Sequence, residues 1–356
     1  MANLKRQSQA VDCVEGSPEL AATARHYSEM ARRHMDVSFE DRMGLATKDV
    51  RYKNNFTKAC ALDICARAIV QAAMKSTGPR PAPCLRVADV ACGRGQDATK
   101  VKYAAQAANT KVAAYFALDL SAENIVSANI IADQYLADVH TRVDVRVGDM
   151  CCPDAYAFIP DGSVNLVTCQ LALHYLFKDP GCLDTFFREV SRVLQPGGLV
   201  MVSYTDGRAV VRRARNLLPA DVEAEPDATV HHRSKFYHFS IPARSVARAV
   251  PSPFGLQYMF SLPGCVEDVP EYLVHEGVMC GSAARAGLCT GPSLPFHEAA
   301  AFFIRMPRFQ EVARKMKCDL EGFKCPDVQD VASLYRFNIL AKSKDVLAEW
   351  SACMVK

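Results

Sequence analysis

Hydrophobic residues in the first two thirds of this chain alternate between short continuous runs and longer stretches with helical spacing. Short apolar runs bounded by turn residues are typical of buried strands, whereas apolar residues at i, i+3 and i+4 indicate amphipathic helices. Because the two patterns alternate between residues 84 and 204, they predict a doubly wound, mostly parallel α/β sheet. The five predicted strands are residues 85–90, 112–118, 144–147, a segment within 160–173, and 199–204.

The segments on either side of this core are less regular. Their spacing nevertheless predicts helices both before and after the sheet, together with two late strands. The predicted helices lie at about 19–33, 53–73, within 269–288 and at 299–316, and the late strands at 254–260 and 334–341.

Residues 206–253 interrupt the alternation and carry several arginines and two adjacent histidines. We expect them to form an insertion over the carboxyl ends of the strands, where ligands bind in sheets of this kind. The predicted organisation is therefore a flexible N-terminus (1–20), one domain (21–345) that contains this insertion, and a C-terminal tail (346–356).

Composition narrows the class of protein. A net charge of +3 gives no strong global field, so any contact with nucleic acid must be local. The 15 cysteines include no C-x-x-C pair, which favours reduced thiols in an intracellular protein over zinc ligands or disulfides. No apolar run is long enough to span a bilayer and the first residues lack a signal sequence, so we expect a soluble, non-secreted protein.

The first predicted strand ends in a turn, Gly93-Arg94-Gly95, that leads into a helix. Such a turn lets the backbone approach a ligand closely and exposes free N–H groups at the helix start. A pyrophosphate-binding fingerprint would need a third glycine. In addition, Asp97 would place a negative charge where it repels a phosphate. The turn therefore favours a ligand with a cationic or zwitterionic group, although G-x-G alone is also typical of ordinary tight turns.

Asp119 directly follows the second predicted strand. An acid at this position of a β-α-β unit usually accepts hydrogen bonds from ribose hydroxyls. The alternative is a helix N-cap, a role that Ser121 could fill instead.

Together, the glycine turn, Asp119, Gly148-Asp149 after the third strand and Pro-Gly-Gly before the fifth resemble class I S-adenosylmethionine-dependent methyltransferases. Four further segments resemble the mRNA cap guanine-N7 methyltransferases. They are ARHYSEMARR (its HY at 26–27, similar to HYN), NNFTK (54–58, similar to NNWIK), CQLALHYLF (169–177, similar to CQF-x-x-HYSF) and FGLQYMFSLPGCVEDVPEYLV (254–274, similar to FG-x-x-Y-x-F-x-L-x-x-x-V-x-DVPE[FY]LV).

This resemblance, which spans about residues 20–342, implies a set of site residues. S-adenosylmethionine would be bound by Lys58, Gly93 and Asp97 at its methionine end, Asp119 at the ribose, Asp149 at the adenine amino group and Gln170 near the sulfonium. The cap guanine would be held by His174, Tyr175, Glu271 and Tyr335, with Arg94 facing the cap phosphates and Asn54 as a further candidate. No metal is implied. Guanine N7 has a free lone pair, so orientation rather than a general base would supply the catalysis.

The sequence departs from the family pattern in two places. The family's DLGCGKGGD is here DVACGRGQD, so Ala91 and Gln96 replace glycines; alanine is small, but glutamine needs room. The basic residue that the family places late in the helix after Asp119 is missing. Phosphate contacts would then come from Arg32, Arg33 or Lys102.

Three of the candidate guanine-binding residues also have ordinary structural explanations. His174 could be a buried, hydrogen-bonded histidine, Glu271 an acid in the first turn of a helix, and Tyr335 part of sheet packing. Their joint occurrence in motif order favours function: methyl transfer from S-adenosylmethionine to N7 of the guanine cap of mRNA. The alternatives are a methyltransferase for a small molecule and a catalytically silent subunit that scaffolds a capping complex.

The resemblance also implies partners and a location. The substrate would be the capped 5′ end of RNA, and an RNA triphosphatase or guanylyltransferase of the capping apparatus is a candidate partner. We expect a monomer without membrane contact, located in the nucleus, with the cytoplasm as the alternative.

Overall fold

The computed structural model describes residues 25, 28–29, 45–77, 83–136, 138, 140–218, 228–246 and 252–355. The predicted flexible N-terminus and most of the predicted helix at 19–33 lie outside the described residues. The same holds for His26 and Tyr27 and for Arg32 and Arg33, two of the candidate phosphate contacts.

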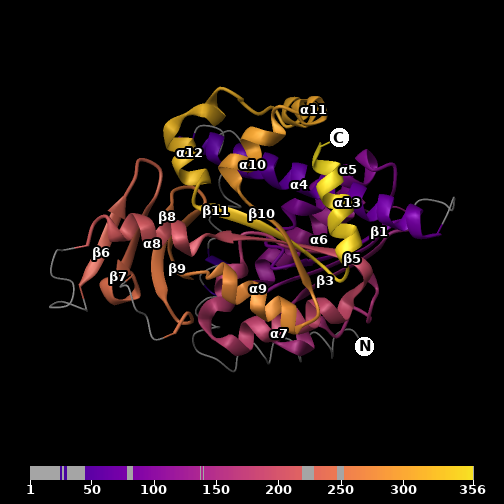
Figure 1. The fold of residues 1–356 in the computed structure, drawn as a ribbon, viewed down its shortest axis with the longest axis horizontal. Coiled ribbons are helices and arrows are strands. Elements are labelled where there is room, and N and C mark those ends of the chain that lie inside the picture. Colours follow the sequence, from indigo (N-terminus) through magenta and orange to yellow (C-terminus); the bar gives the residue numbers. More distant parts are fainter. Residues whose placement is uncertain are drawn as a thin grey trace.

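A seven-stranded sheet forms the centre of the molecule, with strand order β10-β11-β5-β4-β1-β2-β3 (Figure 1). Strands β1 to β5 run parallel to one another, whereas β11 pairs antiparallel with both β5 and β10. The predicted mostly parallel α/β fold is confirmed. The strands are β1 (Leu85–Val90), β2 (Val112–Asp119), β3 (Arg142–Val147), β4 (Val164–Cys169), β5 (Leu194–Thr205), β10 (Cys289–Pro295) and β11 (Tyr335–Ala341).

Edge strand β10 has no counterpart in the prediction. Its sequence, CTGPSLP, contains a glycine and two prolines and shows no apolar alternation. Proline is tolerated on an edge strand, and the pairing with β11 is irregular between Thr290 and Ser293. Pairing with β11, rather than local propensity, therefore makes this segment a strand.

Helices cover both faces of the sheet. On one face, α4 contacts α5, α10, α11, α12 and α13, and α6 packs on α5; α7 and α9 pack together on the other face (Figure 1). No helix in the described ranges is long and apolar enough to cross a membrane. The helices are α4 (Lys48–Thr77), α5 (Gln96–Ala107), α6 (Ala122–Leu136), α7 (Pro180–Val193), α9 (Glu276–Arg285), α10 (Phe296–Phe303), α11 (Pro307–Lys315), α12 (Pro326–Ala332) and α13 (Lys344–Val355), with 3₁₀ turns η1 (Pro153–Tyr156), η2 (Leu173–Lys178), η3 (Ala243–Val246) and η4 (Gly322–Lys324).

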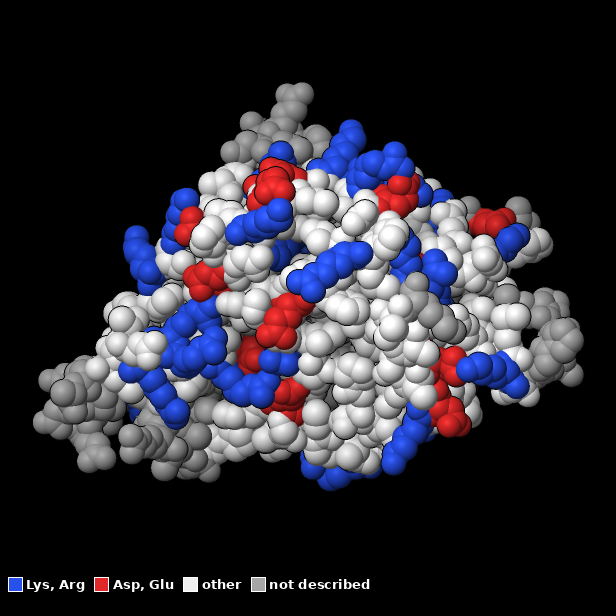
Figure 2. Space-filling view, turned by 45° about the horizontal axis from the view of Figure 1, so that its top comes forward, with Lys and Arg blue, Asp and Glu red and all other residues white. Residues whose placement is uncertain are grey.

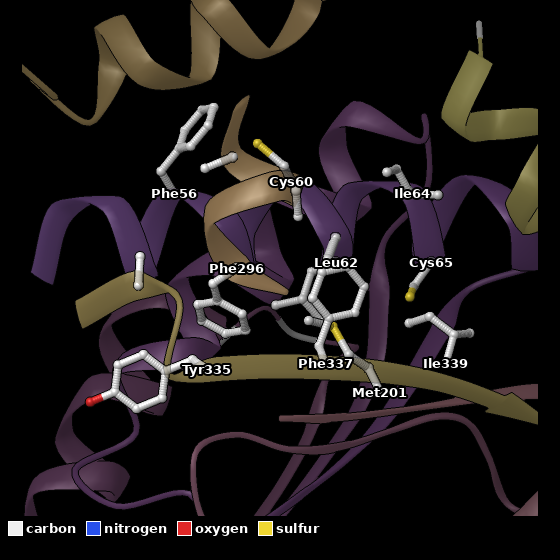
Figure 3. Packing of buried hydrophobic residues seen from close by; sticks show 14 of the residues in the cluster. Phe56, Cys60, Leu62, Ile64, Cys65, Met201, Phe296, Tyr335, Phe337 and Ile339 are labelled. Atoms are coloured by element: carbon white, nitrogen blue, oxygen red, sulfur yellow. The ribbon is translucent and has the colours of Figure 1, made fainter. Parts of the chain in front are cut away.

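Helix α4 is enclosed on two sides. Leu62 and Cys65 point toward β5 and β11, while Phe56 and Cys60 point away from the sheet (Figure 3). All four side chains are fully buried, because the outer side of α4 is covered in turn; the Phe56 ring lies 5.8 Å from that of Phe323 in η4. Apolar side chains on both sides of α4 are therefore buried, so its sequence shows no single hydrophobic face.

A second sheet, antiparallel and four-stranded, stands beside the main one at the left of Figure 1. Together with α8 it follows the carboxyl end of β5, and it extends beyond residue 253, where the predicted insertion ends. Exposed arginines line α8, and Figure 2 shows Lys and Arg side chains gathered on this left part of the molecule. The elements are α8 (Gly207–Arg215), β6 (Thr229–Arg233), β7 (His238–Pro242), β8 (Gln257–Leu262) and β9 (Val266–Tyr272).

The segment around DVPEYLV is a strand, whereas the sequence analysis placed it in a helix. Val269, Glu271 and Leu273 are buried in alternation with less buried neighbours, and Pro270 lies between them. This period of two belongs to a strand, and α9 starts only at Glu276. The alternative explanation of Glu271 as a first-turn helix acid is therefore wrong.

The C-terminal residues 346–356 do not form a separate tail: as far as residue 355 they belong to α13. Its sequence places Val346, Trp350 and Cys353 on one buried face. Trp350 is 1% exposed, donates a hydrogen bond to Cys65 Sγ at 3.3 Å and packs against Phe337. The helix thus packs on both α4 and the main sheet.

We predict that Trp350→Ala lowers the free energy of unfolding by about 3–5 kcal/mol, because it leaves a large cavity between α13, α4 and β11. Denaturant unfolding followed by circular dichroism measures this loss. Val355→Ala, on the same helix but 83% exposed, should change stability by no more than about 0.5 kcal/mol. Equal stability of the two variants would show that α13 does not support the core.

Candidate functional site

The two glycines of the turn after β1 have different structural roles. Gly95 has φ of +75°, and a Cβ there would lie 2.8 Å from Cα of Ala128, so only glycine allows α6 to approach. Gly93 also has a positive φ, but a Cβ there would meet no atom within 4 Å. The space in front of Gly93 is open to a ligand.

The two departures from the family's glycines have different consequences. Ala91 adopts φ of +56°, a left-handed conformation that costs a non-glycine residue about 1–2 kcal/mol. Alanine therefore fits, but with backbone strain. The Gln96 side chain is exposed to solvent at the start of α5, so it needs no space in the interior.

A buried ion cluster lies beside the turn. Lys58 of α4 donates to both carboxylate oxygens of Asp97, at 3.1 and 2.9 Å, and Lys100 donates to Oδ1 at 2.6 Å. Burial alone would raise the pKa of Asp97, but Lys100 and Lys58 outweigh it and hold that pKa below its usual value. The structure thus joins predicted residues Lys58 and Asp97 and adds a second lysine.

Asp119 ends β2 and faces the glycine turn. Its Oδ2 accepts from the Gly93 amide at 2.8 Å, and its Oδ1 accepts from the Ser121 amide and the Asn124 side chain, both at 3.0 Å. The cap of α6 is instead Ser121, whose hydroxyl accepts from the Asn124 amide at 3.2 Å. Burial raises the pKa of Asp119. The N-cap alternative for Asp119 is thereby removed.

Asp149 and Gln170 follow β3 and β4. Asp149 Oδ1 accepts from the Cys151 amide at 2.9 Å, and burial raises the pKa of this carboxyl group. The Gln170 side chain is held at both ends: its Nε2 donates to the Met201 carbonyl at 3.2 Å and its Oε1 accepts from Ser203 at 2.9 Å. Both residues are therefore oriented before any ligand arrives.

A cavity of about 750 Å³ connects the glycine turn with Asp119, Asp149 and Gln170. It runs along the carboxyl ends of the strands and reaches β9 of the small sheet. Lys58, Asp97, His174, Glu271 and Tyr335 are not among its lining residues. The predicted residues that do line it are Gly93, Asp119, Asp149, Gln170 and Tyr175.

His174 of η2 and Glu271 of β9 form a buried polar pair. His174 Nε2 lies 3.7 Å from Glu271 Oε1, and the residues are 3% and 5% exposed. The hydroxyls of Tyr258 and Thr205 both donate to Glu271 Oε2, the latter at 3.0 Å. Neither ring nitrogen of His174 forms a hydrogen bond with a described residue, so it is buried without the partners that the structural explanation required.

Burial lowers the pKa of His174, and the neighbouring Glu271 only partly opposes this. The ring is therefore neutral at physiological pH, with one N–H to donate. Tyr258 and Thr205 occupy one carboxylate oxygen, so Glu271 Oε1 is the oxygen that faces the histidine. The pair thus places a hydrogen-bond acceptor and a hydrogen-bond donor side by side, away from solvent.

Tyr175 and Tyr335 lie near this pair, and Asn54 is a further buried candidate. The Tyr175 ring lies 4.2 Å from that of His174. Tyr335 starts β11 opposite Thr205, beside Phe296, from which its hydroxyl points away (Figure 3). The buried Asn54 has a side-chain oxygen without a hydrogen-bond partner among the described residues.

Two basic candidates differ in position. Arg94 lies half-buried in the glycine turn itself. Lys102 instead lies over the ring of Tyr135, near the end of α6 farthest from Asp119, so its assignment as a phosphate contact is not supported.

The sequence analysis missed three groups that hold the predicted residues: Thr205, Tyr258 and Lys100. Tyr258 carried a signal, since it is the tyrosine of the FG-x-x-Y motif. Lys100 follows Asp97 by three residues on a helix, a spacing that favours ion pairs. Nothing in the local sequence marks Thr205.

A family model described as the mRNA (guanine-N(7))-methyltransferase domain matches residues 17–343. The chain belongs to this family. The mRNA cap guanine-N(7) methyltransferase of Drosophila melanogaster is 27% identical over 289 residues, which cover 78% of this chain and 60% of the fly protein. The mRNA cap guanine-N(7) methyltransferase 1 of Oryza sativa subsp. japonica is 23% identical over 343 residues, which cover 92% of this chain and 84% of the rice protein.

Among solved structures, an S-adenosylmethionine-dependent methyltransferase from Clostridium acetobutylicum matches with a TM-score of 0.43 and 12% identity, covering 88% of this chain and 98% of that chain. The cofactor expected of the mRNA (guanine-N(7))-methyltransferase family, to which the chain belongs, is S-adenosylmethionine. The residues of the site fit it: the Lys58–Asp97 pair suits a zwitterion, the open space at Gly93 admits its chain, and two carboxylates suit its hydroxyl and amino donors.

We predict that Asp119→Ala weakens S-adenosylmethionine binding by about 2 kcal/mol or more, because two ribose hydroxyls lose a charged acceptor. Isothermal titration calorimetry measures the change. Asp161→Ala, which removes an exposed carboxylate outside the cavity, serves as the control. Since Asp119 also holds the Gly93 amide, thermal melting should establish that the variant is folded. Unchanged affinity in a folded protein would exclude Asp119 as the ribose residue.

Proposed function

We propose that this chain transfers the methyl group of S-adenosylmethionine to N7 of the guanine cap at the 5′ end of mRNA. The observation that carries the proposal is the buried pair of His174 and Glu271 beside the cofactor cavity, in a chain that belongs to the cap methyltransferase family. Because the matched segment spans only 60% of the fly relative, activity and substrate are inferred from the site.

The pair complements the hydrogen-bonding edge of guanine. Glu271 Oε1 can accept hydrogen bonds from guanine N1–H and from the N2 amino group. Guanine O6 can accept a hydrogen bond from the N–H of neutral His174. Tyr258 and Thr205 fix the carboxylate through its other oxygen. Adenine lacks the N1 donor and presents an amino group where guanine has O6, so it would leave buried polar groups unpaired.

The cofactor assignments follow the chemistry of the cavity and of the ion cluster beside the glycine turn. We assign Asp97 and Lys58 to the methionine end, Asp119 to the ribose and Asp149 to the adenine amino group, with Gln170 near the reacting centre. When bound, S-adenosylmethionine supplies an activated methyl group on a good leaving group. The side chains then align N7 with that methyl group and exclude water, which is catalysis by proximity and orientation.

No general base is needed, because guanine N7 carries a free lone pair, so we assign His174 as a hydrogen-bond donor rather than as a base. Its lowered pKa and its position opposite Glu271 suit a hydrogen-bond donor to O6. The anionic Glu271 additionally stabilises the positive charge that develops on the ring during transfer. Because His174 is neutral, the pair contains no cation that would repel this positive charge.

A small-molecule substrate is the runner-up. That alternative expects an enclosed apolar pocket, whereas the groups beside the cofactor cavity are a carboxylate, an imidazole and tyrosines. For the capped substrate, the gathering of Lys and Arg side chains around α8 provides a local positive surface (Figure 2). Nuclear location, monomeric state and association with other capping enzymes stay predictions.

We predict that Glu271→Ala loses most methylation of GpppG-capped RNA while it still folds and binds S-adenosylmethionine. Glu271→Gln should recover little, because the amide NH₂ would oppose the guanine donors in one orientation and the charge is gone. The measurement is kcat/KM on capped RNA beside a cofactor titration. Wild-type protein should also reject ApppG ends by about 10⁴-fold, as expected of a site built to pair a donor.

The matched control is Glu267→Ala, which removes an exposed acid from the same strand and should leave kcat/KM unchanged. Tyr258→Phe provides an intermediate test, since it removes one donor that orients the carboxylate. Near-normal methylation by a folded Glu271→Ala protein would contradict the assignment and favour the small-molecule substrate.

A further inference from the structure

The ion cluster beside the glycine turn contains one more cation than the ligand chemistry requires. The methionine end of S-adenosylmethionine carries one ammonium and one carboxylate group, for which one acid and one lysine suffice. Here Asp97 holds both Lys58 and Lys100, and the side chains of all three are 11% exposed. Such burial of an additional charge needs an explanation, because desolvation opposes it.

A second buried carboxylate explains the charge count. Asp89 of β1 is 2% exposed and accepts hydrogen bonds from the hydroxyls of Tyr115, at 2.7 Å, and Thr168, at 2.8 Å. Burial and the neighbouring Asp97 carboxylate raise the pKa of Asp89 to about 6. With Asp89 ionised, the cluster contains two acids and two lysines and is balanced.

We propose that Lys100 is a positioning residue of the cofactor site: it holds the Asp97 carboxylate in place for the methionine ammonium group. Lys58, which comes from a different helix, can then leave Asp97 and bind the methionine carboxylate. This inference rests on the proposed function only in so far as Asp97 binds the cofactor.

The geometry supports this division of work. Lys100 lies one turn beyond Asp97 on α5 and contacts only Oδ1, so it can stay bound while Oδ2 receives a ligand. Lys58 reaches the same carboxylate from α4 and contacts both oxygens. Without Lys100, departure of Lys58 would leave Asp97 facing Asp89 with no protein cation.

The pH dependence follows from the groups that face Asp97. These are Lys58 from α4, Lys100 on its own helix, Asp89 from β1, the Cys92 thiol after β1 and the Tyr115 hydroxyl on β2. Loss of Lys100 removes the strongest group that keeps Asp97 ionised, so its pKa must rise. Protonated Asp97 cannot accept an ammonium group, and cofactor affinity should then fall at a higher pH than in the wild type.

The test compares two ligands that differ only at this end. S-adenosylhomocysteine carries the amino-acid group, whereas 5′-methylthioadenosine lacks it. We predict that Lys100→Met weakens S-adenosylhomocysteine about tenfold or more at pH 7.5, as expected from one charge-assisted contact, and leaves 5′-methylthioadenosine affinity unchanged. The acid limb of S-adenosylhomocysteine binding should move up by about one pH unit or more.

Two variants complete the experiment. Lys100→Arg should restore most of the affinity, because it keeps the charge on Asp97, and Lys102→Met on the same helix should behave as wild type. In methylation assays Lys100→Met should raise KM for S-adenosylmethionine and retain kcat at saturation. If Lys100→Met does not fold, Lys100→Gln carries the same expectations.

The inference is overturned if S-adenosylhomocysteine binding is unchanged, if both ligands weaken equally or if the acid limb does not move. Asp97→Asn separates this failure from that of the cofactor assignment. Unchanged S-adenosylhomocysteine affinity in Asp97→Asn would contradict the role of Asp97 itself. A large loss of affinity in Asp97→Asn together with no loss in Lys100→Met would contradict only the positioning role. Neither outcome depends on which substrate is methylated.

Discussion

The register of the parallel strands is the constraint on which the site depends. Val90 of β1 lies opposite Leu118 of β2 and Cys169 of β4, and Asp119 lies opposite Val147 of β3. The strands therefore end level with one another, and the residues that follow them meet at one edge. This common edge brings together Gly93, Asp119, Asp149 and Gln170, and a slip of one residue would turn these side chains to the other face.

A second register, in the small sheet, supplies the guanine-binding side. Tyr258 on β8 lies directly opposite Glu271 on β9, and cross-strand neighbours of this kind have side chains within contact distance. The bridge between Asp206 and Val274 then returns the chain to the end of β5, where Thr205 also reaches Glu271. The position of this carboxylate is thus determined jointly by two sheets, although its own strand belongs to only one of them.

The sequence predicts what local pattern determines and misses what pairing determines. Strands β1, β2, β4 and β5 are recognisable from short apolar runs and β3 from alternating valines. Asp119 and Asp149 follow from their places after β2 and β3. The β10 segment, with its prolines, becomes a strand only by pairing with β11. DVPEYLV resembles a family motif, but its strand state depends on β8. The partners Thr205 and Tyr258 become apparent only once both sheets are assembled.

The site contains several unfavourable features, and the helical layer offsets them. Ala91 is strained, Asp119 and Asp149 are buried acids, and His174 is buried without a described partner. Each feature opposes folding and leaves a polar group ready for a ligand. On the same side of the sheet as α5, α4 is packed between β5, β11 and the helices from α10 to α13, with large apolar side chains fully buried. Stability is thus provided away from the ligand edge, which can stay polar and incompletely paired because it need not hold the fold together.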